Sequence, residues 1–319
     1  MAKKPAKKIV GKTARSKQLP ALKPGPYADG TPLHEIRYLE CKLILRPNHF
    51  TSRQSLFDFT KVIRRPAAEH EIDFSTKGFV DAPLQIREVL FMDTPANRLY
   101  NNAFILRRRI LYEEGFPTAD PEIVFKFRHP DLQQAAELDV RPQIVGDYLI
   151  KFKAEALPLK HELGGTRLLF SHNVQFPLSH VLENNLQGKG DPISMASMMR
   201  VFPPLQGVKA SSGEKLELVS DTIVEEVLQD LGILDFGEGM SAKANVALWR
   251  VRGDHRPLIG EFAFEVKFKR REDLKERAMA RAQAFFVALQ LAAKDWIDLG
   301  ATKTGVVYRL KGNPPQAHE

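Results

Sequence analysis

Residues 87–109 read REVLFMDTPANRLYNNAFILRRR, and this segment is the most informative part of the sequence for the architecture. Two largely apolar runs flank the Asp-Thr-Pro triplet at 93–95. Apolar runs bounded by Asp and Pro are typical of β-strands joined by a turn. We therefore predict strands at 85–92 and 103–112.

The same reasoning extends along the chain on both sides of this segment. Runs of strand character between turn-forming residues predict further strands at 36–45, 122–128, 136–141, 246–252, 261–269 and 305–310. Helices are expected at 52–63, from 220 or 221 to 231, and at 272–299, with Pro66, Gly232 and Gly300 at their ends. Residues 157–204 favour neither element. The chain is therefore predicted to be an α+β protein with a mostly antiparallel sheet.

Charged residues recur at alternate positions of these predicted strands. Those that share a face are Glu40 and Lys42; Arg107 and Arg109; Lys126 and Arg128; Glu137, Asp139 and Arg141; Arg250 and Arg252; and Glu261 and Glu265. A single pair of this kind more often lies on the solvated face of a sheet. Repetition over at least five strands instead favours a closed barrel with a polar interior, whose apolar alternate residues face outward against helices.

An interior that holds both cations and carboxylates suits a compact polyanion bound together with a divalent metal. Arg and Lys bind phosphate oxygens, and clustered carboxylates bind hard ions such as Mg²⁺ or Mn²⁺. Such a site could hydrolyse its ligand by metal-assisted attack of water on a terminal phosphoryl group.

The sequence also resembles a known family. The Asp-Thr-Pro turn at 93–95 follows an aromatic strand and precedes Leu-Arg-Arg-Arg at 106–109, an order similar to the hallmark of the CYTH superfamily, the triphosphate tunnel metalloenzymes. With gaps, the resemblance extends from about residue 37 to residue 310. It implies an eight-stranded, mostly antiparallel tunnel-like β-barrel with flanking helices. It also implies a divalent metal and cleavage of inorganic triphosphate, thiamine triphosphate or RNA 5′-triphosphate ends, or cyclisation of ATP.

The resemblance and the strand alternation together assign roles to individual residues. The expected phosphate-binding residues are Arg107, Arg109, Lys126, Arg128, Arg250, Arg252 and Lys303. The expected metal ligands are Glu40, Glu137, Asp139, Glu261 and Glu265, and Glu40 and Lys42 are the expected catalytic residues.

Several acids of the family pattern are missing from this sequence. The family opens with Glu-x-Glu-x-Lys, whereas this chain has Tyr38, Glu40 and Lys42. Ala263 stands between Glu261 and Glu265, where the family has two glutamates two residues apart. These losses shift the interior toward positive charge. Two functions therefore stay open: a divalent-metal-dependent hydrolase of a triphosphate-containing substrate, or a catalytically weak binding module for polyphosphate, nucleotide or another phosphorylated anion.

The net charge of +8 belongs to the first residues of the chain. Residues 1–28 contain eight Lys or Arg and no acid, so the remainder has a formal net charge of zero. A basic, Pro-containing segment of this kind is predicted to be disordered and could contact nucleic acid weakly through charge alone. We expect a basic tail at 1–30, a tunnel domain at 31–312 with an insertion at about 157–204, and a second tail at 313–319.

The remaining composition favours a cytoplasmic protein. With 43% hydrophobic residues the chain can form a sizeable core, and its longest apolar runs are too short for a membrane span. Cys41 is the single cysteine, which excludes an intramolecular disulfide. We expect its side chain on the outer apolar face of its strand, opposite Glu40 and Lys42.

Overall fold

The computed structural model describes residues 35–184 and 193–311. One sheet of eleven strands dominates it. The strands are β1 (Tyr38–Leu45), β2 (Asp73–Ser75), β3 (Gln85–Asp93), β4 (Phe104–Glu113), β5 (Phe116–Pro117), β6 (Glu122–His129), β7 (Leu149–Pro158), β8 (Thr166–Pro177), β9 (Glu217–Asp235), β10 (Ser241–Val251) and β11 (Pro257–Lys267).

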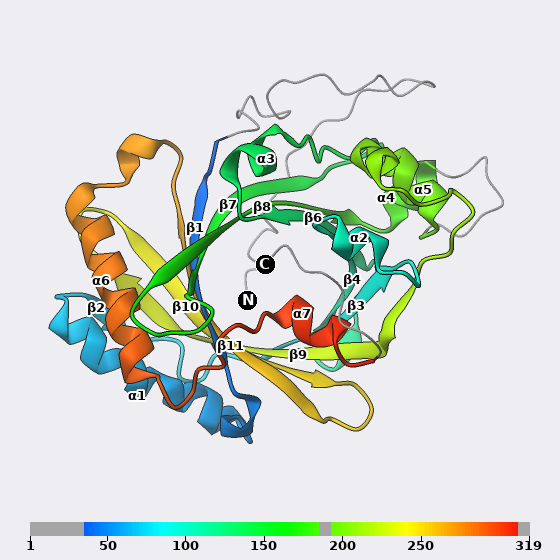
Figure 1. Cartoon of the computed structure of the whole chain (residues 1–319). Coiled ribbons are helices and arrows are strands. Elements are labelled where there is room, and N and C mark those ends of the chain that lie inside the picture. Colours follow the sequence, from blue (N-terminus) through cyan, green and yellow to red (C-terminus); the bar gives the residue numbers. More distant parts are fainter. Residues whose placement is uncertain (1–34, 185–192, 312–319) are drawn as a thin grey trace, which may run out of the picture.

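Nine of these strands close into a barrel (Figure 1). Their order around the barrel is β10-β11-β1-β7-β8-β6-β4-β3-β9, and β9 pairs with β10 to complete the circle. All neighbouring pairs are antiparallel except β1 and β7, which run parallel. The predicted α+β class and tunnel-like, mostly antiparallel barrel are confirmed, with nine strands rather than eight.

Helices cover parts of the barrel's outer surface. The α-helices are α1 (Arg53–Glu69), α2 (Arg98–Asn101), α3 (Leu132–Glu137), α4 (Ser179–Asn184), α5 (Met195–Val201), α6 (Glu276–Ala292) and α7 (Lys303–Tyr308), and the short 3-10 helices are η1 (Pro47–His49), η2 (Pro203–Gly207) and η3 (Arg271–Asp273). Helices α1 and α6 lie side by side against one part of the barrel, and α4 and α5 lie at the opposite end of the view (Figure 1).

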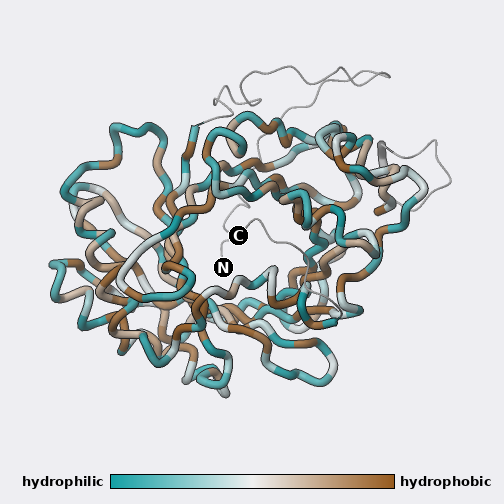
Figure 2. The backbone as a smooth tube through the Cα atoms, in the orientation of Figure 1, coloured by the Kyte–Doolittle hydropathy of each residue, from teal (hydrophilic) through white to brown (hydrophobic). Residues whose placement is uncertain are grey.

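The outward-facing apolar residues of the strands form the core with these helices. Phe59 of α1 and Phe285 of α6 pack in one cluster with Phe262 and Phe264 of β11. A second cluster joins β4, β6 and β8 to α3, α5 and η2. Hydrophilic and hydrophobic residues alternate along the strands accordingly (Figure 2). Cys41 packs against the first cluster, which confirms the expected outer face.

Helix α7 lies within the outline of the barrel and is tied to the Asp-Thr-Pro turn (Figure 1). The buried Asp93 carboxylate accepts hydrogen bonds from the backbone N–H groups of Thr94, Leu99 and Tyr100, at 2.7, 2.9 and 3.0 Å, and from the Tyr308 hydroxyl at 3.0 Å. Burial raises the pKa of Asp93 to about 6 despite these donors. Asp93 therefore links the turn to α7, whose first residues line the interior.

The predicted helix ending at 231 is wrong, because residues 217–235 form strand β9. The apolar residues of this segment fit one face of a helix, but β9 pairs with β2, β3 and β10, and this long-range pairing decides its structure. Gly232, the expected helix end, lies where the β9–β10 register shifts. A Cβ atom on Gly232 would lie 2.4 Å from the Ser75 carbonyl oxygen, so the close approach of β2 requires glycine here.

Two predicted strands are also wrong. Residues 132–137 form α3, which Asp131 caps by accepting the Gln134 N–H at 3.0 Å, and extended coil follows it. The strand expected at 305–310 is instead α7, which Thr302 caps by accepting the Gly305 N–H at 3.0 Å. In each segment a side chain at the helix N-terminus accepts a hydrogen bond from a backbone N–H group. In a strand the same N–H group would need an acceptor on a neighbouring strand.

Several boundaries also differ from the predictions. Helix α1 continues past Pro66 to Glu69, and α6 is shorter than expected at both ends. The proposed insertion at 157–204 contains β8, a barrel strand, so only its later part lies outside the barrel. Residues 1–34, 185–192 and 312–319, including the predicted basic tail and C-terminal tail, lie outside the described residues. Within the described ranges, no helix has the length and apolar character needed to cross a membrane.

Candidate functional site

The interior of the barrel holds a cavity of about 330 Å³. Alternate residues of all nine barrel strands line it, together with Thr302, Lys303 and Thr304 at the start of α7. Among these lining residues ten are Lys or Arg and five are Asp or Glu. The cavity is therefore strongly polar and carries an excess of five formal positive charges.

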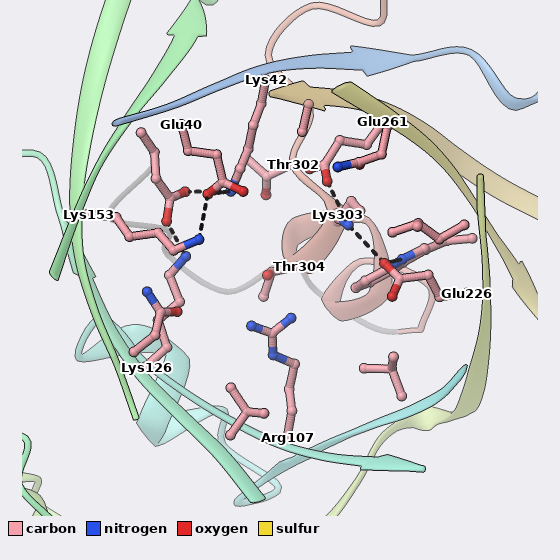
Figure 3. A pocket seen from close by; sticks show the side chains of 18 of the residues that line it. Glu40, Lys42, Arg107, Lys126, Lys153, Glu226, Glu261, Thr302, Lys303 and Thr304 are labelled. Atoms are coloured by element: carbon pink, nitrogen blue, oxygen red, sulfur yellow. Dashed lines mark hydrogen bonds and ion pairs between the residues drawn. The ribbon is translucent and has the colours of Figure 1, made fainter. Parts of the chain in front are cut away.

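One wall of the cavity is formed by the arginines of β4. Arg107 extends from β4 toward the middle of the cavity (Figure 3). Within the described part of the chain, no side chain forms a hydrogen bond or ion pair with its guanidinium, and its Nε atom is buried without a partner. Burial and the nearby charge of Arg109 lower the pKa of Arg107 to about 10. Its contact is with the Phe91 ring, whose centroid lies 5.5 Å from the guanidinium carbon.

Arg109 has a carboxylate partner, unlike Arg107. It lies two residues after Arg107, on the same face of β4, and donates to Glu122 at 2.6 Å and to Gln175 at 3.3 Å. A guanidinium group that already donates to a carboxylate gains less free energy from binding an additional anion. Arg107 is therefore the better placed of the two to bind an added anion.

The opposite wall contains a network of lysines and glutamates. Glu155 of β7 is 1% exposed and accepts from Lys42 at 3.0 Å, from Ser171 at 2.5 Å, and from Lys126. Lys42 also forms an ion pair with Glu40 at 2.9 Å. Burial alone would raise the pKa of Glu155, but Lys126 and Lys42 hold it well below its ordinary value. Glu155 and Lys42 are therefore charged at neutral pH, whereas burial lowers the pKa of Lys126 well below its ordinary value.

The network continues from Glu40 onto β7 and β11. Lys153 contacts Glu40 at 3.3 Å (Figure 3). It also pairs with Glu265 of β11. Although burial opposes it, the charges of Lys153 and Lys42 lower the pKa of Glu40 to about 2. The same carboxylates outweigh burial at Lys153 and raise its pKa.

A third group of charges lies beside α7. Lys303 contacts Glu261 at 2.7 Å and Glu226 at 3.1 Å, and its ammonium lies 4.7 Å from the centroid of the Trp249 ring. Glu226 also accepts from the Trp249 indole N–H at 2.7 Å and pairs with Arg87 at 3.3 Å. Burial would raise the pKa of Glu226, but Lys303 and Arg87 lower it to about 2.

Most of the residues expected at the site lie around this cavity. The expected residues that line it are Glu40, Lys42, Arg107, Arg109, Lys126, Arg128, Glu261 and Lys303. Glu265 joins them through its ion pair with Lys153. Lys303 reaches the cavity from a helix rather than from the strand that the sequence predicted.

Four expected site residues lie elsewhere. Glu137 is exposed on α3, where its side chain accepts from Gln133 at 2.8 Å, and Asp139 follows in coil and pairs with Arg141. Trp249 faces the cavity, so its neighbour Arg250 faces outward, where it donates to Glu225 at 2.5 Å. Lys243 and Asn245 also line the cavity, so the odd-numbered positions of β10 face inward as far as Trp249.

Arg252 is the fourth of these residues, and it also points away from the cavity. Its side chain contacts Tyr112 and Glu88. Glu88 follows Arg87 on β3, and Arg87 lines the cavity, so Glu88 and its partner lie on the outer face. The placement of Arg250 and Arg252 inside the barrel is therefore corrected.

The sequence analysis missed several residues that line the cavity. Lys151, Lys153 and Glu155 occupy alternate positions of β7, so the same period-2 signal was present in a segment to which no element was assigned. Glu226 and Asp230 were missed because their segment was interpreted as a helix. Arg87 was read as part of the strand before the turn, without a functional role.

The carboxylates around the cavity do not fit the divalent metal that the family resemblance implies. Across the described residues, no three His, Cys, Asp or Glu side chains gather as a metal site would require. Glu40, Glu155 and Glu265 each form an ion pair with a lysine, and Glu261 pairs with Lys303. Mg²⁺ and Mn²⁺ would have to compete with these ammonium groups for every carboxylate.

Comparison with known proteins gives structural neighbours only. No protein-family model and no curated protein sequence matches the chain. The fold is similar to that of a Hippeastrum protein that was assigned as an adenylyl cyclase and is described as having a dominant triphosphatase activity. The two chains are 14% identical, the match covers 88% of this chain and 98% of that chain, and the TM-score is 0.39. A Bacillus halodurans protein assigned as an adenylate cyclase matches with 12% identity, coverage of 84% and 95%, and a TM-score of 0.35. A Pyrococcus horikoshii protein matches with 10% identity, coverage of 84% and 96%, and a TM-score of 0.31.

Proposed function

We propose that the protein binds a compact polyanion, a triphosphate or longer polyphosphate group, inside the barrel, as a divergent member of the CYTH superfamily. The observation that carries this proposal is the excess of ten Lys and Arg over five Asp and Glu around a cavity of about 330 Å³. Among the described residues Arg107 has no ion-pair partner, and a cation without a counter-charge is costly in a protein interior, so a bound anion would complete the electrostatics there. The volume is within the usual range for small-molecule sites.

The chemistry of the lining residues favours phosphate over other anions. Guanidinium groups bind phosphate oxygens through two parallel N–H donors, and ammonium groups add point charges. Arg107 presents its guanidinium from one wall, and Lys42, Lys126 and Lys153 present ammonium groups from the other. A ligand that reaches both walls needs several charged oxygen centres in a row, which a polyphosphate supplies.

Isothermal titration with inorganic triphosphate in the presence of EDTA tests this proposal. We expect binding that is tighter than for orthophosphate and that weakens as salt rises, because the attraction is between charges. Sulfate at equal ionic strength controls for nonspecific screening. Absence of both binding heat and thermal stabilisation by triphosphate, with and without added Mg²⁺, would refute it.

Metal-dependent hydrolysis is a second candidate function, favoured by a different observation. Glu265, Glu40 and Glu155 are register partners on the neighbouring strands β11, β1 and β7, so three acids stand in one row. Release of phosphate from inorganic triphosphate, thiamine triphosphate and ATP, measured in EDTA, Mg²⁺ and Mn²⁺, tests it. Metal-dependent release that disappears in Glu40→Gln would establish the hydrolase, and absence of release with intact binding would leave the binding module.

A further inference from the structure

The row of three acids Glu265, Glu40 and Glu155 is hereafter called the glutamate row. Neighbouring carboxylates on adjacent strands repel one another unless a cation lies between them. In other proteins a hard divalent ion often occupies such a position. What lies between these glutamates therefore decides whether the site needs a metal.

Lysine ammonium groups lie at both junctions of the glutamate row. Lys153 contacts Glu40 at 3.3 Å and also contacts Glu265, so it bridges the first junction. Lys42 contacts Glu40 at 2.9 Å and Glu155 at 3.0 Å, so it bridges the second. Both lysines come from inward positions of barrel strands.

A third lysine lies at the end of the glutamate row. Lys126, which is 5% exposed, contacts Glu155 from β6. Ser171 donates to the same glutamate at 2.5 Å. Each of the three glutamates thus has Lys42 or Lys153 as an ion-pair partner, and a metal ion would have to compete with these ammonium groups for the carboxylate oxygens.

We propose that the polyphosphate site of this protein is independent of divalent metal, with Lys42 and Lys153 supplying at the glutamate row the positive charge that a metal ion would otherwise supply. This inference rests on the proposed binding function and specifies its chemistry. The glutamates hold the two ammonium groups in place, and the remaining N–H donors of each ammonium are available for phosphate oxygens. A divalent ion could enter only by displacing both lysines from their carboxylates.

Two measurements on the full-length protein test this inference. In the first, Mn²⁺ alone is titrated into protein stripped with EDTA, and free Mn²⁺ is followed by its electron paramagnetic resonance signal. In the second, the affinity for inorganic triphosphate is measured in EDTA and in Mg²⁺, with the free-ligand concentration corrected for the magnesium complex. We expect no stoichiometric loss of the Mn²⁺ signal and an affinity change well below tenfold.

A double variant tests the role of the lysines directly. Lys42→Met with Lys153→Met removes both bridging ammonium groups and leaves three carboxylates in a row. We expect this variant to gain Mn²⁺ binding and Mn²⁺-dependent thermal stabilisation, and Lys61→Met, at an exposed lysine of α1, to gain neither. If the double variant does not fold, the two measurements on the unmodified protein decide the question.

The outcomes separate this inference from the proposed function. Stoichiometric Mn²⁺ binding by the unmodified protein, or triphosphate binding that is lost in EDTA and restored by Mg²⁺, would overturn the metal-independent site while leaving anion binding intact. Absence of triphosphate binding in both conditions would instead overturn the proposed function, and the Mn²⁺ titration would still decide the state of the glutamate row.

Discussion

Replacing Arg107 should weaken anion binding and stabilise the unliganded protein at the same time. A hydrogen bond to a charged group contributes about 1.5–3 kcal/mol. Losing it at the phosphate site should therefore weaken binding of inorganic triphosphate by about 10- to 100-fold in Arg107→Met. Methionine keeps much of the side chain's apolar length, so the change removes mainly charge and donors.

The gain in stability follows from the direction of the pKa shift. Burial and Arg109 lower the pKa of Arg107 to about 10, which means that the protonated guanidinium is less favourable in the folded than in the unfolded chain. This cost is present at every pH below about 10. Removing it should raise the free energy of unfolding by on the order of 1–3 kcal/mol, after allowing for partial solvent screening. For a domain of this size, the melting temperature should then rise by about 2–6 °C.

Differential scanning fluorimetry and isothermal titration on the same samples check both parts. Arg65→Met on α1 is the matched control, because Arg65 is 84% exposed and lies on the outer surface. We expect the control to leave triphosphate affinity and melting temperature nearly unchanged. A lower melting temperature for unliganded Arg107→Met, together with unchanged affinity, would refute the reasoning.

Three other outcomes depend on charges or burial in the same fold. Glu155→Gln removes the ion-pair partner of the buried Lys126 and one of the two carboxylate partners of Lys42, so we expect a loss of about 3–5 kcal/mol in urea unfolding; an unchanged midpoint would contradict this. The Glu226 pKa of about 2 means that its contribution to stability is complete above pH 4.5 and is lost as pH falls toward 2. Acid unfolding of Glu226→Gln should therefore be less steep over that range, and parallel curves would count against it. Burial raises the pKa of Cys41 to about 12, so Ellman's reagent should react faster after unfolding in urea than with the native protein; equal rates would show that the thiol is accessible.

The barrel and much of its lining could be predicted because the period of two is a local signal. In β1 the charged residues Glu40 and Lys42 alternate with outward apolar residues, and in β4 the outward neighbour Leu106 is apolar although Arg108 is charged. Glu40, Lys42 and Arg107 could therefore be assigned to one interior from the sequence. The same signal was available in β7 for Lys153 and Glu155. It was not used because that segment was not assigned to any element.

The rest depended on interactions that a local pattern does not contain. Strand β9 has apolar residues that also fit a helix, and its pairing with three strands distant in sequence selects the extended form. Arg250 faces outward because Lys243, Asn245 and Trp249 hold the inward positions of β10, and the charge of Arg250 alone does not show which face of the strand it occupies. Lys303 was assigned to the site, but the helix that carries it is set by the Thr302 cap and by packing of Tyr308 against the turn.

The distribution of ion pairs shows where this interior is electrostatically complete and where it is not. Near Glu40 and Glu155 every carboxylate has lysine partners, and near α7 Lys303 joins Glu261 to Glu226. A protein that needed only to stabilise its barrel could have paired Arg107 in the same way or replaced it with an apolar residue, since a half-buried cation without an ion-pair partner reduces stability. Arg107 faces a wall on which the glutamates have lysine partners. A bound anionic ligand that supplies the negative charge missing at Arg107 best explains this arrangement. The position of that cation, more than the number of basic residues, is why we place the anion between β4 and the wall formed by β1 and β7.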